Sequence, residues 1–161
     1  MPKVETIGCN AFAGSGLQKV SLPKVTVIEH ATFFGCMGLS DVSMPNVVDI
    51  GRRAFCDCWR LWWAKMDNVT NIGQEAFAGC RSLRKAKMPM ITNIAERAFA
   101  ECETLTDVQM PSEGVTVAEP IVSSTSVTIE IELLGAASDA QAASATTRRR
   151  SCRSRCACAA V

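Results

Sequence analysis

The chain has 161 residues, of which 48% are hydrophobic and 20% are charged, and its formal net charge at pH 7 is +1. This length and apolar fraction suffice for one soluble domain with a buried core. The near-neutral charge excludes nucleic-acid binding driven by bulk electrostatics. The N-terminal segment MPKVETIGCNAF has no basic stretch followed by a long apolar run, and no apolar stretch of membrane length occurs, so the sequence does not support a secretion signal or a membrane span.

One pattern of residues recurs every 22 positions along most of the chain. Four columns show it: Ile28, Ile50, Ile72 and Ile94; Phe33, Phe55, Phe77 and Phe99; Cys36, Cys58, Cys80 and Cys102; and Leu39, Leu61, Leu83 and Leu105. An earlier copy over residues 7–23 keeps the pattern with one residue deleted before its leucine. Repetition at a fixed period predicts five structural units that bury their apolar faces against one another.

The apolar spacing changes within a single unit. One set of residues has the spacing of a helix face: Ile72, Ala76, Cys80 and Leu83. This spacing predicts a short helix or helical turn. Over residues 85–88 lysines alternate with apolar residues, which predicts a short strand with one buried face, and Pro89 ends it. Each unit is therefore predicted to be one coil of strand plus helical turn, and stacked coils pair their strands into a parallel sheet.

The pattern I-G-x-x-A-F-x-G-C-x-x-L-x-x-V-x-M-P, as in IGQEAFAGCRSLRKAKMP, resembles the BspA-type leucine-rich repeat over roughly residues 4–117. The resemblance implies an α/β solenoid of about five 22-residue coils, with a parallel sheet on one face and short helical turns on the other. It also implies a surface-antigen-like recognition or adhesion protein at the cell surface or outside the cell. The third copy departs from the family pattern at Ala64 and Asp67, and Trp62 and Trp63 lie outside the motif.

The cysteine column and the single histidine are the residues to consider for catalysis or metal binding. The cysteines share their column with Ser15, which predicts small, buried, reduced side chains. Parallel side chains in a row fit poorly with disulfide geometry and with tetrahedral metal coordination. His30 occupies a polar, variable column that predicts exposure, whereas Cys36 points inward, so the two cannot form a nucleophilic pair. We therefore expect no enzyme activity and no catalytic, cofactor-binding or metal-binding residue.

The outward positions of the predicted strands carry the candidate partner-binding residues. Reading across coils, one column contains Lys19, Asp41, Trp63, Lys85 and Asp107, and the next contains Ser21, Ser43, Lys65, Lys87 and Gln109. The candidates are Trp62, Trp63, Lys65, Arg84, Lys85 and Lys87, because exposed Trp and Arg are enriched at binding hot spots. They suit an acidic protein or a glycan-bearing partner. A structural alternative stacks Trp63 against Lys85 in a cation–π contact and lets Trp62 fill the space beside Ala64.

The composition changes beyond the repeats. The alternation in SVTIEIELLG, residues 126–135, predicts a strand that covers or extends the C-terminal end of the sheet. The final stretch is rich in Ala, Ser and Arg, which predicts disorder; Cys152, Cys156 and Cys158 match no standard zinc spacing. The chain is thus divided into a solenoid over 1–117, a candidate capping strand over 118–135 and a disordered tail over 136–161. Asn68-Val69-Thr70 is a glycosylation sequon that matters only in a secreted chain.

The sequence favours a non-enzymatic scaffold that binds a protein or glycan partner through the strand face and uses no cofactor. Two alternatives stay open. The arginine-rich stretch RRRSCRSR suits an intracellular adaptor or a nucleic-acid-associated protein. The chain also fits a fragment of a longer surface protein. The oligomeric state and the compartment are left open by the residues.

Overall fold

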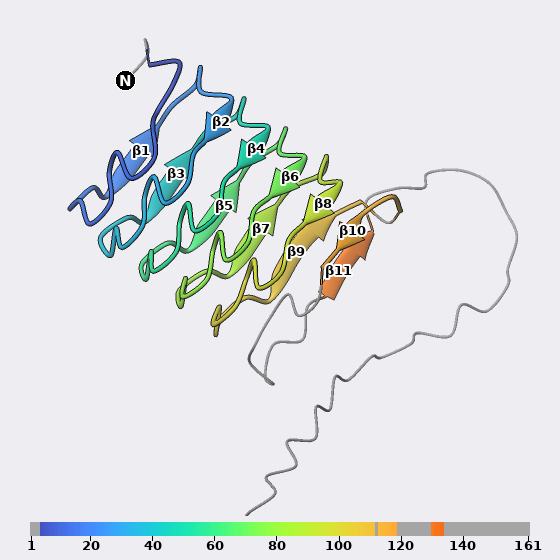
Figure 1. The fold of residues 1–161 in the computed structure, drawn as a ribbon. Coiled ribbons are helices and arrows are strands. Elements are labelled where there is room, and N and C mark those ends of the chain that lie inside the picture. The colour runs from blue at the N-terminus through green and yellow to red at the C-terminus, as the bar shows by residue number, and fades with distance from the viewer. Residues whose placement is uncertain (1–3, 112, 119–129, 134–161) are drawn as a thin grey trace, which may run out of the picture.

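The computed structural model describes residues 4–111, 113–118 and 130–133, which form a solenoid of stacked coils with two parallel sheets (Figure 1). The larger sheet has the order β1 (Lys19–Ser21), β3 (Asp41–Ser43), β5 (Trp63–Lys65), β7 (Lys85–Lys87), β9 (Asp107–Met110) and β11 (Glu130–Leu133). The smaller sheet has the order β10 (Thr116–Val117), β8 (Asn93–Ile94), β6 (Asn71–Ile72), β4 (Asp49–Ile50) and β2 (Val27–Ile28). The predicted parallel solenoid is confirmed, whereas the smaller sheet was not predicted.

The strand register follows the 22-residue repeat. Val42 pairs with Ala64, Ala64 with Ala86, and Ala86 with Val108, so each step to the next coil is one repeat of the sequence. These middle residues of the strands are buried, and the residues on either side of them face outward. Successive side chains of a strand point to opposite faces. The inside and outside assignments of the lysine-containing strand are therefore confirmed.

The core is a continuous column of phenylalanine rings. Phe12, Phe33, Phe55, Phe77 and Phe99 stack in sequence, with centroids 5.2–5.3 Å apart and interplanar angles of 4–8°. The last four rings are 0–1% exposed. Parallel coils hold equivalent side chains about 4.8 Å apart along the axis, which sets this nearly face-to-face arrangement. Each ring therefore depends on the coils before and after it for its burial.

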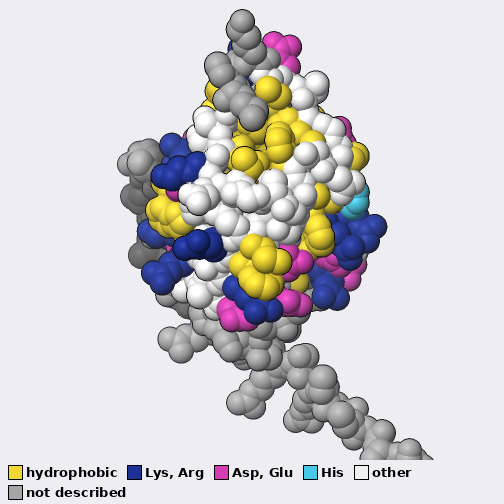
Figure 2. All heavy atoms as spheres, turned by 90° about the vertical axis from the view of Figure 1, so that its left-hand side faces the viewer, with side chains coloured by type: hydrophobic (Ala, Val, Ile, Leu, Met, Phe, Trp, Pro, Cys, Tyr) yellow, Lys and Arg dark blue, Asp and Glu magenta, His cyan; other side chains and the backbone are white. Residues whose placement is uncertain are grey.

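The first coil lacks a described coil on its outer side. Its apolar residues Phe12, Leu17 and Val20 are accordingly only partly buried, although they pack against the core. Seen from this end of the solenoid, hydrophobic side chains gather in the middle of the surface and basic side chains lie along its flanks (Figure 2). The same columns become fully buried one coil further along the chain.

No helix occurs between the two sheets in the described residues, so the predicted helical turns were wrong there. Two columns have left-handed backbone: Ala31, Arg53, Glu75 and Arg97 with φ of 51–56°, and Gly35, Asp57, Gly79 and Glu101 with φ of 58–73°. A left-handed residue every fourth position prevents a right-handed helix. Successive turns nevertheless bring every fourth residue inward, as a helix does, which explains why the spacing was misread.

Hydrogen bonds between coils replace the bonds that a helix would make within itself. The amide of Phe55 donates to the Ala76 carbonyl and the amide of Asp57 donates to the Ala78 carbonyl, both at 2.8 Å. The intervening amide of Cys56 donates to the Arg53 carbonyl at 3.2 Å. Alternate amides thus point along the solenoid axis, where they bond to the next coil, and the intervening ones bond within their own turn. The turns stiffen the stack in the same way as the sheets do.

Glu101 occupies a left-handed position that Gly35 and Gly79 fill in other coils. Left-handed backbone costs a residue with a side chain roughly 1–2 kcal/mol, and a substitution by glycine removes this strain. Glycine also gives the unfolded chain more conformational entropy, which reduces the gain in stability by about 0.4–1 kcal/mol. Glu101→Gly is therefore expected to raise the free energy of unfolding by about 0.5–1 kcal/mol in urea denaturation. Glu103→Gly, two residues away and outside the left-handed region, should lower it. A loss of stability in both variants would contradict the strain at residue 101.

Candidate interaction surface

The structure brings the six sequence-predicted residues together on the outer side of β5 and β7. Trp63 is the register partner of Lys85, and Lys65 is the register partner of Lys87. Trp62 and Arg84 immediately precede the same two strands. Lys87 is half-buried and the other five are exposed. We call this set, Trp62, Trp63, Lys65, Arg84, Lys85 and Lys87, the tryptophan–lysine face.

Two neighbouring indoles form the apolar part of this face. The rings of Trp62 and Trp63 are 5.8 Å apart between centroids and tilted by 44°. Their side chains remain 45% and 38% exposed, although the next residue, Ala64, is fully buried. Two large apolar rings in water carry a free-energy cost that a partner surface would remove. This pair is therefore the strongest candidate anchor on the described surface.

The charges of the face are only partly balanced within the chain. Lys85 Nζ lies 3.4 Å from Asp107 Oδ2, and Lys65 Nζ lies 3.7 Å from Asp67 Oδ2. Arg84 and Lys87 make no ion pair with another described residue. Lys85 is thus directed to a carboxylate in place of the predicted stacking on Trp63. The cation–π contact found in the described residues joins Arg81 to Trp59, with 5.4 Å from Cζ to the ring centroid.

A shallow depression of about 420 Å³ lies at the edge of the tryptophan–lysine face. Its lining consists of Arg60, Trp62, Ser82, Arg84 and Thr104. Sequence reasoning found Trp62 and Arg84 but missed the other three. Arg60, Ser82 and Thr104 form one column across the coils, and comparing it with the column of Trp62 and Arg84 would have revealed the depression. The short side chains of Ser82 and Thr104 lie next to the long side chains of Trp62 and Arg84.

A second groove, of about 820 Å³, follows the loops that lead into the smaller sheet. It is lined by Glu5, Thr6, Lys24, Thr26, Asn46, Val48, Asn68 and Thr70. Several of these groups already hold coils together: Asn68 Nδ2 donates to the Pro45 carbonyl at 2.7 Å, and Lys24 lies 3.7 Å from Glu5. The groove is therefore a consequence of coil-to-coil bonding, and it lacks aromatic side chains.

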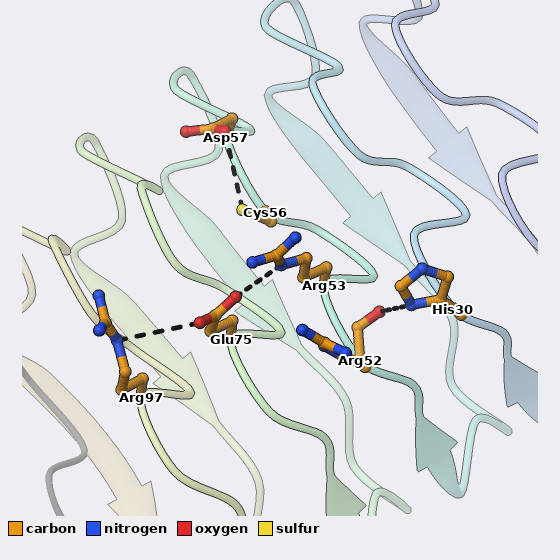
Figure 3. A network of polar contacts seen from close by, with 7 residues as sticks. All are labelled: His30, Arg52, Arg53, Cys56, Asp57, Glu75 and Arg97. Atoms are coloured by element: carbon orange, nitrogen blue, oxygen red, sulfur yellow. Dashed lines mark hydrogen bonds and ion pairs between the residues drawn. The ribbon is translucent and has the colours of Figure 1, made fainter.

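A ladder of charges crosses the turns on another side of the coils (Figure 3). Arg53 Nε donates to Glu75 Oε2 at 2.6 Å, and Arg97 Nε lies 4.0 Å from Glu75 Oε1. The hydrogen bond from Arg53 lowers the pKa of the Glu75 carboxyl and raises the pKa of the Arg53 guanidinium. The Glu75 side chain is only 16% exposed. The ladder fastens three successive coils.

Replacing Glu75 by Gln should remove a pH-dependent part of the stability. Because the pKa of Glu75 is lowered in the folded chain, its contribution is present above its unfolded value of about 4.3 and is lost as the pH falls through the folded value. Glu75→Gln is expected to be less stable than the wild type at pH 7 in urea denaturation, and the gap should narrow at pH 3. Glu96→Gln, at an exposed position of the next coil, is the control. A gap that stays constant with pH would contradict this role.

The cysteine column is structural, as predicted. The thiols of Cys58, Cys80 and Cys102 are buried and donate to the carbonyls of Phe33, Phe55 and Phe77 at 3.1–3.2 Å. Burial raises the pKa of the Cys102 thiol to about 12. A buried thiol held in its protonated form is a poor nucleophile. Within the part of the chain that the structure describes, no cluster of three metal-binding side chains is found.

His30 and Cys36 are separated as the sequence predicted. His30 is exposed, and its Nδ1 lies 3.0 Å from the backbone oxygen of Arg52. Cys36 is buried, and its thiol donates to the Phe12 carbonyl at 3.0 Å. The two side chains therefore have different partners. No positive feature of the described residues indicates catalysis.

The stacked coils, the two parallel sheets and the ordered core columns define a solenoid repeat protein. The BspA type leucine-rich repeat region matches in six copies over residues 5–128, and the chain belongs to this family. The repeated columns of the sequence predicted five units. The family match ends at residue 128, before β11, which pairs in parallel with β9 as a sixth strand of the larger sheet. The predicted capping role of 118–135 stays a prediction, and the tail over 136–161 lies outside the described residues.

A solved leucine-rich repeat protein shares this fold. The T. pallidum leucine-rich repeat protein TpLRR is 22% identical, with a TM-score of 0.55 over 71% of this chain and 67% of its own. A leucine-rich repeat protein from Bacteroides ovatus is 20% identical, with a TM-score of 0.47; the match covers 74% of this chain and 39% of that protein. The search of curated proteins gave no match. No helix suited to crossing a bilayer occurs in the described residues.

Proposed function

We propose that this solenoid is a non-enzymatic recognition scaffold that binds a partner protein through the tryptophan–lysine face. The observation that carries the proposal is the exposed pair of indoles, 5.8 Å apart between ring centroids, at the middle of the larger sheet. Exposed tryptophan is the residue type most enriched at binding hot spots, and arginine accompanies it. The surrounding cations provide a polar rim that favours an acidic partner.

Family membership supports the general role. Leucine-rich repeat families generally serve as protein-interaction scaffolds, and the BspA type is often associated with the cell surface. An adhesive role at the cell surface is part of the proposal. A glycan is the second candidate ligand, because adjacent, tilted indoles offer apolar faces on which sugar rings can pack. The alternative use of the arginine-rich tail depends on residues 136–161, outside the described part.

Substitutions on the face should separate binding from folding. The immobilised full chain is used to retain partners from an extract of its source cells, and the retained protein is then purified for affinity measurement. Trp63→Ala is expected to weaken that affinity about tenfold or more, and Lys85→Glu with Lys87→Glu should weaken it further at low salt. Phe34→Ala, which removes an equally exposed ring from the turns, is the matched control.

Circular dichroism of each variant verifies that the coils remain folded. The proposal fails if Trp63→Ala and the double charge reversal both retain wild-type affinity while Phe34→Ala weakens binding. The protein part of the purified partner can also be removed with a protease. If the remaining glycan still binds to the immobilised chain, the second candidate is favoured.

A further inference from the structure

We propose that the depression lined by Arg60, Trp62, Ser82, Arg84 and Thr104 is a subsite for a carboxylate side chain on an extended acidic segment of the partner protein. The inference deepens the proposed function and rests on it. It adds Arg60 to the tryptophan–lysine face and assigns a chemical class to the recognised segment.

The depression follows from a size difference between two columns. Arg60, Ser82 and Thr104 occupy the same position in three successive coils, two residues before the column of Trp62 and Arg84. The short Ser82 and Thr104 side chains leave a hollow of about 420 Å³ beside the longer ones. One guanidinium comes from the coil of β5 and the other from the coil of β7. A side chain of the partner that enters here meets two cations from different coils.

Both guanidinium groups carry uncompensated charge. Their basic neighbours are paired: Arg81 Nε lies 3.9 Å from Glu103 Oε1, and Lys85 Nζ lies 3.4 Å from Asp107 Oδ2. Arg60 and Arg84 form no ion pair with any residue that the structure describes. Arginine presents a planar fork of donors that matches a carboxylate in a two-bond arrangement. The lining therefore favours a carboxylate acceptor from a partner.

The rest of the lining narrows the choice of acceptor. Thr104 Oγ1 is already bonded to the carbonyls of Arg81 at 2.8 Å and Leu83 at 3.1 Å, so its position is fixed by the backbone. The described donors that remain are mainly guanidinium N–H groups, which favour a group with acceptors only, such as an ionised carboxylate. The Trp62–Trp63 pair adjoins the hollow and suits an aromatic residue next to the acidic one.

Fixed carboxylates near the hollow argue against a continuous polyanion. Glu103 precedes Thr104 of the lining, Asp107 is the register partner of Lys85, and Asp41 lies further along the same outward column of the sheet. A nucleic acid or a heavily sulfated glycan laid across this face would meet these like charges. A peptide with spaced acidic side chains can place a carboxylate in the hollow and uncharged groups opposite these like charges. The charge pattern therefore favours an acidic peptide segment over a polyanionic chain.

Fluorescence anisotropy of labelled peptides on the full chain tests the subsite. The probe is a short fluorescein-labelled peptide of alternating Glu and Tyr, and its neutral counterpart alternates Gln and Tyr. The acidic peptide is expected to bind about tenfold more tightly than the neutral one, and high salt should reduce this preference. Arg60→Gln and Arg84→Gln should each weaken binding of the acidic peptide about tenfold. Arg52→Gln, an exposed arginine among the turns, should leave it unchanged.

Several outcomes would overturn the subsite: equal affinity for the two peptides, no binding of the acidic peptide, wild-type affinity of Arg60→Gln, or preferential binding of a sulfated oligosaccharide. Arg60 lines the depression but is not part of the tryptophan–lysine face, so its substitution tests the subsite separately from the proposed function. If Arg60→Gln is neutral while Trp63→Ala still weakens the captured partner, the face binds but the subsite is wrong. If Trp63→Ala is neutral as well, both are wrong.

Discussion

Phe77→Ala is expected to lower the free energy of unfolding by about 3–5 kcal/mol, the range for deleting a fully buried aromatic ring. Phe77 is 0% exposed and stacks between Phe55 and Phe99, at 5.2 and 5.3 Å between ring centroids. The neighbouring rings cannot collapse into the space, because parallel strands and inter-coil hydrogen bonds fix the distance between coils. The cavity should therefore stay open and its full cost should be felt.

Guanidinium denaturation followed by far-ultraviolet circular dichroism measures this loss. Phe12→Ala is the matched control, because Phe12 terminates the same stack, is only half-buried and contacts one ring, Phe33. Its loss should be clearly smaller. Stability in a solenoid is shared between neighbouring coils, so a central defect affects both sides. Equal losses in the two variants would show that burial depth along the stack does not govern stability.

The sequence predicted the inside of this solenoid well because burial repeats with the chain. The columns of Phe33, Cys36 and Leu39 were read directly from the 22-residue period, and the structure buries every member of them from the second coil onward. The turns were misread as helical for a physical reason. Left-handed residues at Arg53 and Asp57 carry no sequence signal, since only some coils have glycine in the second column.

The candidate surface was predictable in position but not in detail. The strand period placed Trp63, Lys65 and Lys85 outward, and the register confirms their neighbours. The ion pair of Lys85 with Asp107 was missed although both residues were in the same predicted column. Trp63 and Asp107 lie on either side of Lys85 in this column, and either could contact its ammonium group. The column shows which residues are neighbours but not the direction in which the lysine side chain points. The depression around Arg60 was missed because it depends on side-chain size in two columns together.

Gly73→Ala is expected to destabilise the chain by about 3 kcal/mol, at the upper end of the range for overpacking. Gly73 is the residue after β6, and its backbone lies against the preceding coil. A Cβ at this position would lie 2.7 Å from the Arg52 nitrogen and 2.7 Å from the Gly51 carbonyl carbon. Both neighbours are backbone atoms, so no side chain can rotate away.

The coils would have to separate to admit the methyl group. The amide of Gly73 donates to the Ile50 carbonyl at 2.8 Å, a bond that holds these coils together and that separation would lengthen. Ala95 follows in the same column, so one methyl group is tolerated a coil further on. At Gly73 the added group would be compressed against the Arg52 nitrogen and the Gly51 carbonyl carbon, both 2.7 Å away. Hydrogen exchange should therefore detect faster exchange of the Gly73 amide in addition to the lower stability.

Gly16→Ala is the control for the glycine substitution itself. A Cβ at Gly16 would meet no atom within 4 Å. Replacing a glycine in an unstrained position stabilises proteins by about 0.4–1 kcal/mol through the unfolded state, so the two variants should move in opposite directions. If Gly73→Ala matched Gly16→Ala in urea denaturation, the contact between coils would be looser than 2.7 Å implies. Close packing against the backbone of the preceding coil would then not explain why glycine occupies position 73.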